Sequence, residues 1–485
     1  MSWRALCKIV GLALLVIGLT MIPSLIVAGI YHELPALLAF LYTIFWSAGV
    51  GIPMMYLGQD FEEDLRIRDG FLVVTLVWLI AAIMGAVPFW MSGAIPDFID
   101  AFFESCSGFT TTGCSILTDI ESLPKSILFW RSFTHWIGGM GILIFAIALM
   151  PSLGISGQNV IVSEAPGPTL DKLTPKISDT AKMLYSIYFL FTVIETVLLC
   201  LGGMSLFDSL IHTFGSVGTG GLSNYSDSVA HFDSAYIQIV ITVFMILCGT
   251  NFNLFYLSYK QRWNYFKHDS EFKLYIGIII GFSLLIMLNL RFSGVYDNIG
   301  ESLRHSLFQV SSVITTTGYA TADFNLWPSF SKMLLLLLMF VGGCASSTGG
   351  GIKVIRILVL LKLIRRGIAT SLHPRAVVNI RLNDTTIPSE TVTNAANHAF
   401  LYLVLLFSST LLLSLDGFDI ITNFTAAITC LGNIGPGFNL VGPMGGFSMF
   451  SGPAKLLCSF LMLAGRLELY TLMIILTPKF WRPNR

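Results

Sequence analysis

Long apolar runs constrain the fold of this chain more than any other feature of its sequence. Of its 485 residues, 54% are hydrophobic and 12% are charged, whereas soluble domains carry about 25% charged residues. A bilayer core of about 30 Å requires about 20 apolar residues in a helix. Most of the runs approach that length, and they fall at residues 9–30, 70–91, 126–150, 235–258, 273–290, 333–341, 397–415 and 456–477. The sequence therefore predicts an all-α integral membrane protein that crosses the bilayer several times.

A weak internal repeat lies between these runs. Four shorter segments, too short to cross a membrane, each end in a loop of small residues with a glycine, and they recur roughly every 100 residues. The segments cover residues 100–114, 206–221, 301–319 and 419–437, and their reference glycines are Gly113, Gly220, Gly318 and Gly435. Each repeat therefore predicts a unit with one span, a half-helix, a re-entrant loop and a second span.

Four such units predict a pseudo-fourfold arrangement, and two additional transmembrane helices precede them at residues 9–30 and 36–57. We divide the chain into this N-terminal pair and four pore units, with a cytoplasmic loop opening the second unit and a Gly-rich, broken second helix in the third. The corresponding boundaries are residues 1–69, 70–152, 153–262, 263–366 and 367–485.

Lys and Arg residues are distributed unevenly between the two predicted faces of the membrane. With ten spans both termini lie on one side, and most basic residues fall on that side. Basic loops are retained in the cytoplasm, so we expect both termini to be cytoplasmic. The longest basic inner loops are predicted at residues 154–180 and 361–393, where a soluble regulator could dock.

The four loops favour a dehydrated cation as their ligand. A cation that leaves water needs oxygen atoms in place of its hydration shell, and rings of backbone carbonyls supply them. Glycine lets the backbone adopt the conformations that turn carbonyls inward. Each loop also follows the C-terminal end of its half-helix, where the helix dipole contributes about −0.5 of an elementary charge. The repeat therefore predicts a cation-selective pathway.

Four carboxylates recur in or near the half-helices, at Glu104, Asp208, Glu301 and Asp419. Carboxylates near a helix N-terminus stabilise the positive end of its dipole. We therefore predict that these residues cap the half-helices, and the alternative is that they attract cations to the pathway.

The motifs around the loops resemble those of the TrkH/TrkG/KtrB family of potassium transporters. They are TTTG at residues 110–113, WIGGMG at 136–141, GTGG at 218–221, TTTG at 315–318 and SSTGGGIKVIR at 346–356. The resemblance covers nearly the whole chain. It implies a K+-selective, ion-translocating subunit of a bacterial potassium uptake system in the inner membrane, with K+ as the transported ion and no covalently bound cofactor.

In such proteins, carbonyls near the loop glycines line the selectivity filter. The resemblance therefore implies a potassium-binding filter formed by Thr111, Thr112, Gly113, Gly218, Thr219, Gly220, Thr316, Thr317, Gly318, Asn433, Ile434 and Gly435. Some sodium-permeable relatives carry serine at the first-loop glycine, so Gly113 favours potassium over sodium.

The resemblance also implies two kinds of protein partner. One is a TrkA-like cytoplasmic ring of RCK-type, nucleotide-binding domains that gates the pathway, and the other is a second copy of the chain in a homodimer. Composition and spacing by themselves indicate neither partner, and zero net charge gives no indication of nucleic acid.

A glycine cluster interrupts the helix that would otherwise run from residue 332 to residue 366. Glycine costs about 1 kcal/mol per helical position relative to alanine, so a regular helix cannot persist through it. We predict an unwound segment that gates the pathway, and the alternative is a close helix crossing at small residues. The gate residues would be Gly342, Gly343, Ser346, Ser347, Thr348, Gly349, Gly350 and Gly351.

Arg466 lies inside the last apolar run. An arginine at membrane depth is costly and faces protein or a water-filled cavity. We predict that Arg466 belongs to the gate and limits cation flow electrostatically. The alternative is a structural ion pair with Glu468 or Glu195.

Two other transport functions are alternatives to this prediction. A sodium or mixed sodium/potassium pathway would have the same architecture. A secondary transporter for an organic solute would use inverted repeats and broken helices, which produce two symmetric halves rather than four similar loops. No nucleophile–base pair, metal cluster or Gly-x-Ser-x-Gly elbow occurs in a plausible polar pocket, so we do not expect an enzyme.

Overall fold

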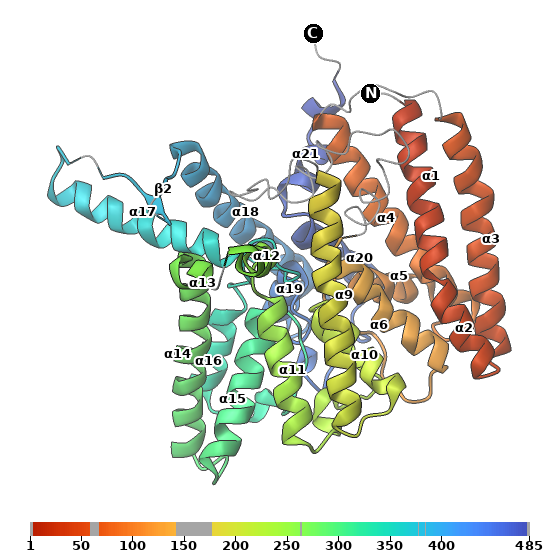
Figure 1. Cartoon of the computed structure of the whole chain (residues 1–485), viewed down its shortest axis with the longest axis horizontal. Coiled ribbons are helices and arrows are strands. Elements are labelled where there is room, and N and C mark those ends of the chain that lie inside the picture. The colour runs from red at the N-terminus through yellow and green to blue at the C-terminus, as the bar shows by residue number, and fades with distance from the viewer. Residues whose placement is uncertain are drawn as a thin grey trace.

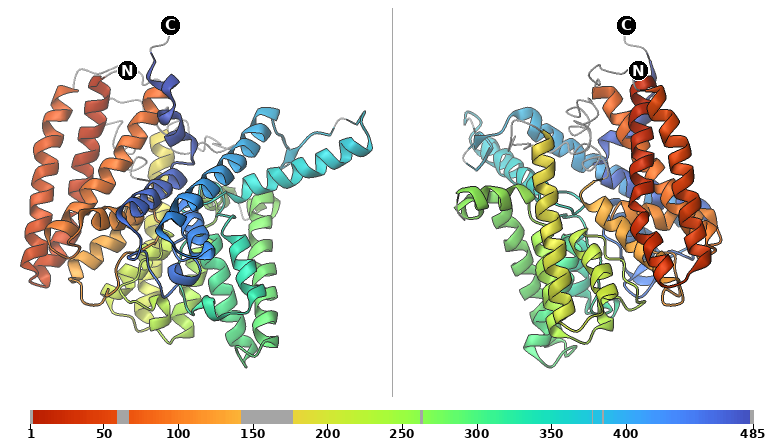
Figure 2. Two further views of the ribbon diagram at one scale, coloured as in Figure 1. Left: turned by 180° about the vertical axis from the view of Figure 1, so that it is seen from behind. Right: turned by 45° about the vertical axis from the view of Figure 1, so that its right-hand side comes forward.

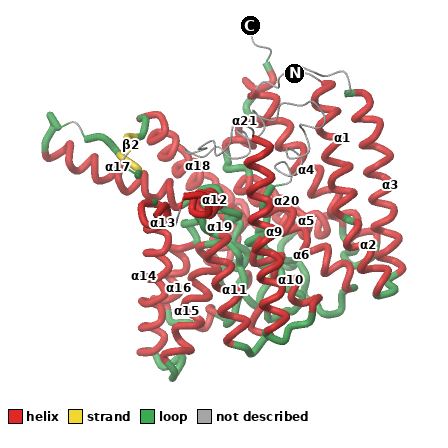
Figure 3. Tube along the Cα trace, in the orientation of Figure 1, coloured by secondary structure: helices red, strands yellow, loops and turns green. Residues whose placement is uncertain are grey.

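The computed structural model of the chain describes residues 3–58, 67–141, 177–261, 264–376, 378–383 and 385–482. It is a bundle of helices with one short two-stranded hairpin (Figures 1 and 3). The predicted all-α membrane architecture is therefore confirmed. The predicted boundary between residues 152 and 153 lies outside the described residues, as does most of the predicted basic loop at 154–180.

Two helical spans precede the first unit, as predicted. α1 (Trp3–Thr20) continues into α2 (Ile22–Ile30), and α3 (Leu34–Leu57) returns beside them (Figure 1). The backbones of α1 and α3 approach closely, because a Cβ on Gly11 would lie 2.7 Å from the carbonyl oxygen of Gly51. Small residues allow such close crossings between membrane helices.

Glu33, in the turn before α3, joins this helix pair to the first unit. Its carboxylate accepts hydrogen bonds from the backbone N–H groups of Lys125 at 2.6 Å and Ser126 at 2.9 Å. These residues begin α6 (Lys125–Gly139), whose N-cap residue, Pro124, offers no side-chain hydrogen bond. Glu33 therefore caps a helix distant in sequence.

Replacing Glu33 with alanine is expected to lower the free energy of unfolding by about 1–2 kcal/mol, because α6 loses the side-chain cap that the Glu33 carboxylate provides. Thermal unfolding of the purified full-length chain in detergent measures the change. Asp233→Ala, which removes an exposed carboxylate, is the matched control and should leave the melting temperature unchanged. Equal melting temperatures for the two variants would contradict the capping role.

Each of the four units contains a long first helix, a short pore helix and a second helix. The first helices are α4 (Ile67–Met91), α9 (Ile177–Leu201), α14 (Ser270–Phe292) and α18 (Ser389–Leu413). The pore helices are α5 (Phe98–Phe109), α10 (Leu206–Val217), α15 (Ile299–Ile314) and α19 (Ile420–Gly432). The second helices begin as α6, α11 (Ala235–Cys248), α16 (Ser329–Leu338) and α20 (Gly452–Arg466). After a break, the last three continue as α12 (Phe252–Gln261), α17 (Val354–Leu372) and α21 (Tyr470–Leu476).

The second helices of the second and fourth units are not the continuous spans that the sequence predicted, whereas the break predicted in the third unit is present between α16 and α17. Among the described residues, six helices are long and apolar enough to cross a membrane, and two bent pairs raise this number to eight. α11 and α12 meet at 88°, and α20 and α21 meet at 119°. At the break between α11 and α12, the backbone bonds to the third unit instead of to the next helical turn. The carbonyl of Gly249, for example, accepts from the backbone N–H of Cys344 at 2.9 Å.

Side-chain caps begin all four pore helices. The N-cap residues are Asp97, Ser205, Asn298 and Asp419. The prediction that Asp419 is a capping residue is therefore confirmed. For Glu104 the prediction is wrong, because this residue lies in the middle of α5, where it is fully buried and ion-paired with Arg131.

A helical arm extends from the body of the molecule. It consists of α17, the hairpin of β1 (Arg381–Leu382) and β2 (Thr385–Thr386), and the beginning of α18, and Figure 2 shows its projection. α17 continues to Leu372, beyond the unit boundary predicted at residue 366. The short helix α13 (Asn264–His268) connects the second and third units.

Candidate functional site

The four pore helices end in the same backbone turn. In each turn one residue is left-handed, with φ between 54° and 57°, and these residues are Thr111, Thr219, Thr316 and Asn433. Two residues later a glycine has φ between 74° and 100°, at Gly113, Gly221, Gly318 and Gly435. The residue between them donates its backbone N–H to the carbonyl five positions earlier, at 2.8–2.9 Å. This is the hydrogen bond of a Schellman helix end.

The shared geometry changes the register of the second loop. From the sequence, Gly220 was predicted to match Gly113, and the filter stretch of this loop was predicted at residues 218–220. Because Thr219 is the left-handed residue, Gly221 is the structural equivalent of Gly113, and the equivalent stretch is 219–221. Gly218 instead lies at the C-cap of α10. In the other three loops the predicted stretches coincide with the turn.

The four loops close a ring. A Cβ atom built on each ring glycine would crowd the carbonyl oxygen of the middle residue in the next loop. The contacts run from Gly113 to Gly220, from Gly221 to Thr317, from Gly318 to Ile434, and from Gly435 to Thr112. Because the fourth loop returns to the first, the loops surround one axis. The middle carbonyls lie where successive loops meet.

Buried side chains hold these turns in a strained conformation. Thr111, Thr219 and Thr316 are fully buried, and β-branched residues rarely adopt positive φ. The hydroxyls of Thr315 and Thr317 lie 2.8 Å apart across the third turn, and the first loop has the same pair. Strained backbone persists where its surroundings determine it, so the packing around these turns fixes their conformation.

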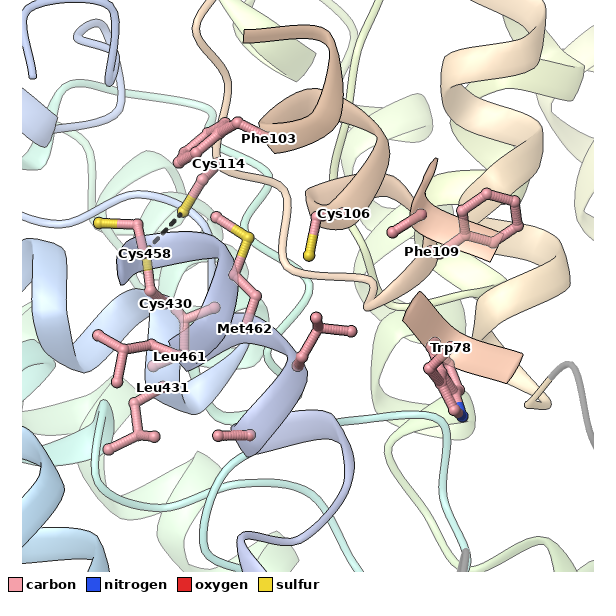
Figure 4. Close-up of a cluster of buried hydrophobic side chains, with 14 of the residues drawn as sticks. Trp78, Phe103, Cys106, Phe109, Cys114, Cys430, Leu431, Cys458, Leu461 and Met462 are labelled. Carbon is pink, nitrogen blue, oxygen red and sulfur yellow. Dashed lines mark hydrogen bonds between the residues drawn. The ribbon is translucent and has the colours of Figure 1, made fainter. Parts of the chain in front are cut away.

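The fourth loop is built differently from the others. Asn433 replaces the left-handed threonine, and its amide nitrogen donates to Thr112 Oγ1 and to the Met462 carbonyl, both at 2.9 Å. Cys114, Cys430 and Cys458 lie together in a cluster of buried hydrophobic side chains (Figure 4). Within it, Cys114 Sγ lies 3.9 Å from Cys430 Sγ and donates to the Gly435 carbonyl at 3.2 Å. The first and fourth loops are therefore joined by side-chain hydrogen bonds.

The electrostatics of the ring favour a cation. All four turns are the C-terminal ends of pore helices, and each such end carries a partial negative charge of about −0.5. The groups that converge are backbone carbonyl oxygens, which replace water around an alkali cation. An anion would meet only repulsion at this point.

The glycine-rich segment between α16 and α17 lies directly against the ring, on the side toward which the pore helices point. Its two ends pair with each other, because Gly342 N–H donates to the Ile352 carbonyl at 2.9 Å. The Gly350 N–H donates to Thr316 Oγ1 at 2.6 Å, and a Cβ on Gly350 would lie 2.7 Å from the Gly432 carbonyl. Residues 342–352 are not helical, so the alternative of a helix crossing does not describe them.

Arg466, at the end of α20, connects this segment to the first unit. Its guanidinium donates to the carbonyls of Thr348 and Gly139, both at 2.9 Å, and to that of Gly138. The two carboxylates considered as ion-pair partners have other contacts: Glu468 pairs with Arg356, and Glu195 accepts from Ser216. Arg466 therefore binds carbonyls of the first and third units from its position in the fourth.

Helical spans, four re-entrant pore helices and a closed ring of carbonyl-bearing loops define a multi-pass membrane protein of the ion-transport class. The family model described as TrkH, a cation transport protein, matches residues 39–482. The chain belongs to this TrkH family.

Known relatives match over their whole length. The Trk system potassium uptake protein TrkH of Escherichia coli K12 is 38% identical, and the match covers 99% of this chain and 100% of that protein. TrkG of the same organism is 34% identical, with 99% of each chain covered. The crystal structure of the potassium transporter TrkH from Vibrio parahaemolyticus superimposes with a TM-score of 0.89 at 36% identity, and it covers 99% of this chain and 100% of that one.

Proposed function

We propose that this chain is the K+-translocating membrane subunit of a bacterial Trk-type potassium uptake system, located in the inner membrane with both termini in the cytoplasm. The single observation that carries the proposal is the closed ring of four equivalent turns, each ending a pore helix. The proposed potassium-binding stretches are residues 111–113, 219–221, 316–318 and 433–435. The names of the full-length relatives, which are potassium uptake proteins, support K+ as the ion.

The glycine-rich segment and Arg466 form the proposed gate. The segment hydrogen-bonds to the ring at Thr316, and Arg466 fastens it to the first unit through the carbonyl of Thr348. A cation leaving the ring toward the proposed cytoplasmic side would meet this segment and a fixed positive charge. Opening therefore requires that the segment or Arg466 move.

A TrkA-like, nucleotide-binding cytoplasmic partner and a homodimer complete the proposed assembly. Exposed apolar residues line the projecting α17, namely Leu361, Ile364, Ile368 and Leu372. Exposed apolar stripes of this kind mark surfaces that bind a protein or a membrane, which supports a second copy at the arm. The molar mass of the purified chain in detergent measures this association.

Growth of a bacterium that lacks its own potassium uptake systems tests the proposed function. The full-length chain should restore growth at low K+ when co-expressed with a TrkA-like partner, and reconstituted vesicles should accumulate Rb+ more readily than Na+. Equal uptake of Rb+ and Na+ would instead support the mixed sodium/potassium alternative. Failure to transport either cation would overturn the proposal.

Gly113→Ser is expected to lower the K+/Na+ flux ratio by roughly tenfold, equivalent to about 1.4 kcal/mol. Serine at φ 81° is strained, and its Cβ would overlap the Gly220 carbonyl oxygen, so the carbonyls of the first two loops must move apart. Competition of Na+ against Rb+ uptake in vesicles gives the ratio. Gly93→Ser, at φ 77° with no atom within 4 Å of the added Cβ, is the control and should retain the parent ratio. A parent-like K+/Na+ flux ratio for Gly113→Ser would contradict this prediction, because the ring would then tolerate displacement of its carbonyls.

A further inference from the structure

A fully buried ion pair lies behind the first two loops of the ring. Arg131 Nε, on α6, is 2.5 Å from Glu104 Oε1, in the middle of α5. The side chains are 2% and 0% exposed. Removing two charges from water is costly, and such a pair persists only when further hydrogen bonds satisfy it.

Those hydrogen bonds connect the pair to two different loops. Glu104 accepts from the Ser115 hydroxyl at 2.9 Å and from the Ile116 N–H at 3.0 Å. Both residues belong to the segment that follows Gly113, which we call the outgoing arm of the first loop and which is distinct from the helical arm at α17. Arg131 donates to the carbonyl of Ser223 at 2.7 Å, in the arm that leads away from Gly221. One ion pair therefore fixes the outgoing arms of neighbouring loops relative to each other.

The helix that carries Arg131 makes a second connection between the same loops. His135, one turn further along α6, accepts from the Leu222 N–H at 3.2 Å through Nε2. Its other ring nitrogen, Nδ1, must then carry the proton, and it donates to the Gly108 carbonyl at 2.8 Å. Arg131 and His135 together hold the second loop against the first pore helix.

Among the described pore helices, only α5 of the first unit carries a carboxylate at this place. Seven residues before the left-handed residue of each turn, the four pore helices carry Glu104, His212, Gln309 and Ala426. His212 Nε2 lies 3.0 Å from the Ser223 hydroxyl, and Gln309 donates to the Ala322 carbonyl at 3.4 Å. The first three pore helices thus each support their own outgoing arm from an equivalent position. The ion pair adds a connection between units.

We infer that Glu104 and Arg131 are positioning residues for ion selectivity: they hold the outgoing arms of the first and second loops at the separation that places the ring carbonyls around K+. This inference rests on the proposed function of the ring. The pair does not touch the ion. It acts through Ser115 and Ser223, each two residues beyond a ring glycine, and selectivity depends on the number and position of the carbonyl oxygens.

Glu104→Gln tests the inference because it removes the charge and keeps the shape of the side chain. In vesicles containing the full-length chain, we expect the K+/Na+ flux ratio to fall about tenfold, which corresponds to about 1.4 kcal/mol. Ser115→Ala removes one donor to the carboxylate without leaving a buried charge unpaired. It should lower the ratio in the same direction by about threefold. The ratio is independent of the amount of folded protein, so a purely structural role would not change it.

Asp100→Asn is the matched control. Asp100 lies on the same pore helix, near its outer end, and its carboxylate is 2.6 Å from Lys455 Nζ on α20. Breaking this ion pair should lower stability alone, and the Asp100→Asn variant should keep the K+/Na+ flux ratio of the parent chain.

The outcomes separate this inference from the proposed function. If the parent chain does not favour K+ over Na+, the proposed function fails. If the parent is selective and Glu104→Gln retains its ratio, the positioning role is overturned. Where Glu104→Gln cannot be purified in folded form, an unchanged ratio for Ser115→Ala overturns it. A drop in ratio for Asp100→Asn equal to that of Glu104→Gln would also overturn it, because the effect would then follow any weakened pore helix.

Discussion

Replacing Gly221 with alanine is expected to abolish potassium uptake. Gly221 has φ 74°, a conformation that costs an alanine roughly 1–2 kcal/mol. The new Cβ would also overlap the carbonyl oxygen of Thr317 in the next loop. That carbonyl belongs to the proposed potassium-binding ring, so the overlap must displace either the second or the third loop. Growth at low K+ and Rb+ uptake into vesicles both measure the loss.

Gly203→Ala provides the control in the same unit. Gly203 has φ 94°, and an added Cβ would have no atom within 4 Å, so this variant has the backbone strain without the overlap. It should retain most of the uptake of the parent chain. Parent-like uptake by Gly221→Ala, at equal protein levels in the membrane, would show that Gly221 is not part of the ring.

Replacing Arg466 with glutamine is expected to raise potassium flux in the absence of a cytoplasmic partner by roughly tenfold or more. A fixed positive charge about 4 Å from a passing cation opposes it by on the order of 4 kcal/mol at an effective dielectric constant of about 20. The variant also loses the charged hydrogen bonds to Thr348 and Gly139 that fasten the glycine-rich segment. Both changes favour flux, which Rb+ entry into vesicles measures.

Lys362→Gln is the control for this prediction. Lys362 lies on α17 and donates to the Arg381 carbonyl at 2.6 Å, away from the ring, so its loss should leave flux unchanged. Unaltered flux through Arg466→Gln together with a lower melting temperature would assign Arg466 a structural role. Increased flux with a parent-like melting temperature would support the gate.

Much of the membrane architecture was accessible from local sequence. Spans of about 20 apolar residues follow directly from bilayer thickness, and the N-terminal pair was predicted in this way at residues 9–30 and 36–57. The pore helices were recognisable because small residues and glycine end them. Three of the four predicted ring stretches, at residues 111–113, 316–318 and 433–435, coincide with the turns.

The second loop shows where local pattern was insufficient. Gly220 and Gly221 are adjacent, and sequence gives no reason to prefer either as the ring glycine. The choice is made by the left-handed turn at Thr219 and by the contact between Gly221 and the third loop. The breaks in α11–α12 and α20–α21 were missed because each pair of helices is long and apolar enough to be taken for one span. At the break in α11–α12, backbone groups bond to the third unit, which local sequence does not show.

The sequence by itself determined that this chain enters a membrane, that it repeats four times, and that each repeat ends a short helix in a glycine loop. These properties depend on hydrophobicity and on backbone freedom, which are local. Only the tertiary structure decided that the loops close one ring, that Glu104 pairs with Arg131 instead of capping a helix, and that Arg466 reaches carbonyls of other units. Those contacts join residues far apart in the chain, and their geometry exists only once the units have packed together.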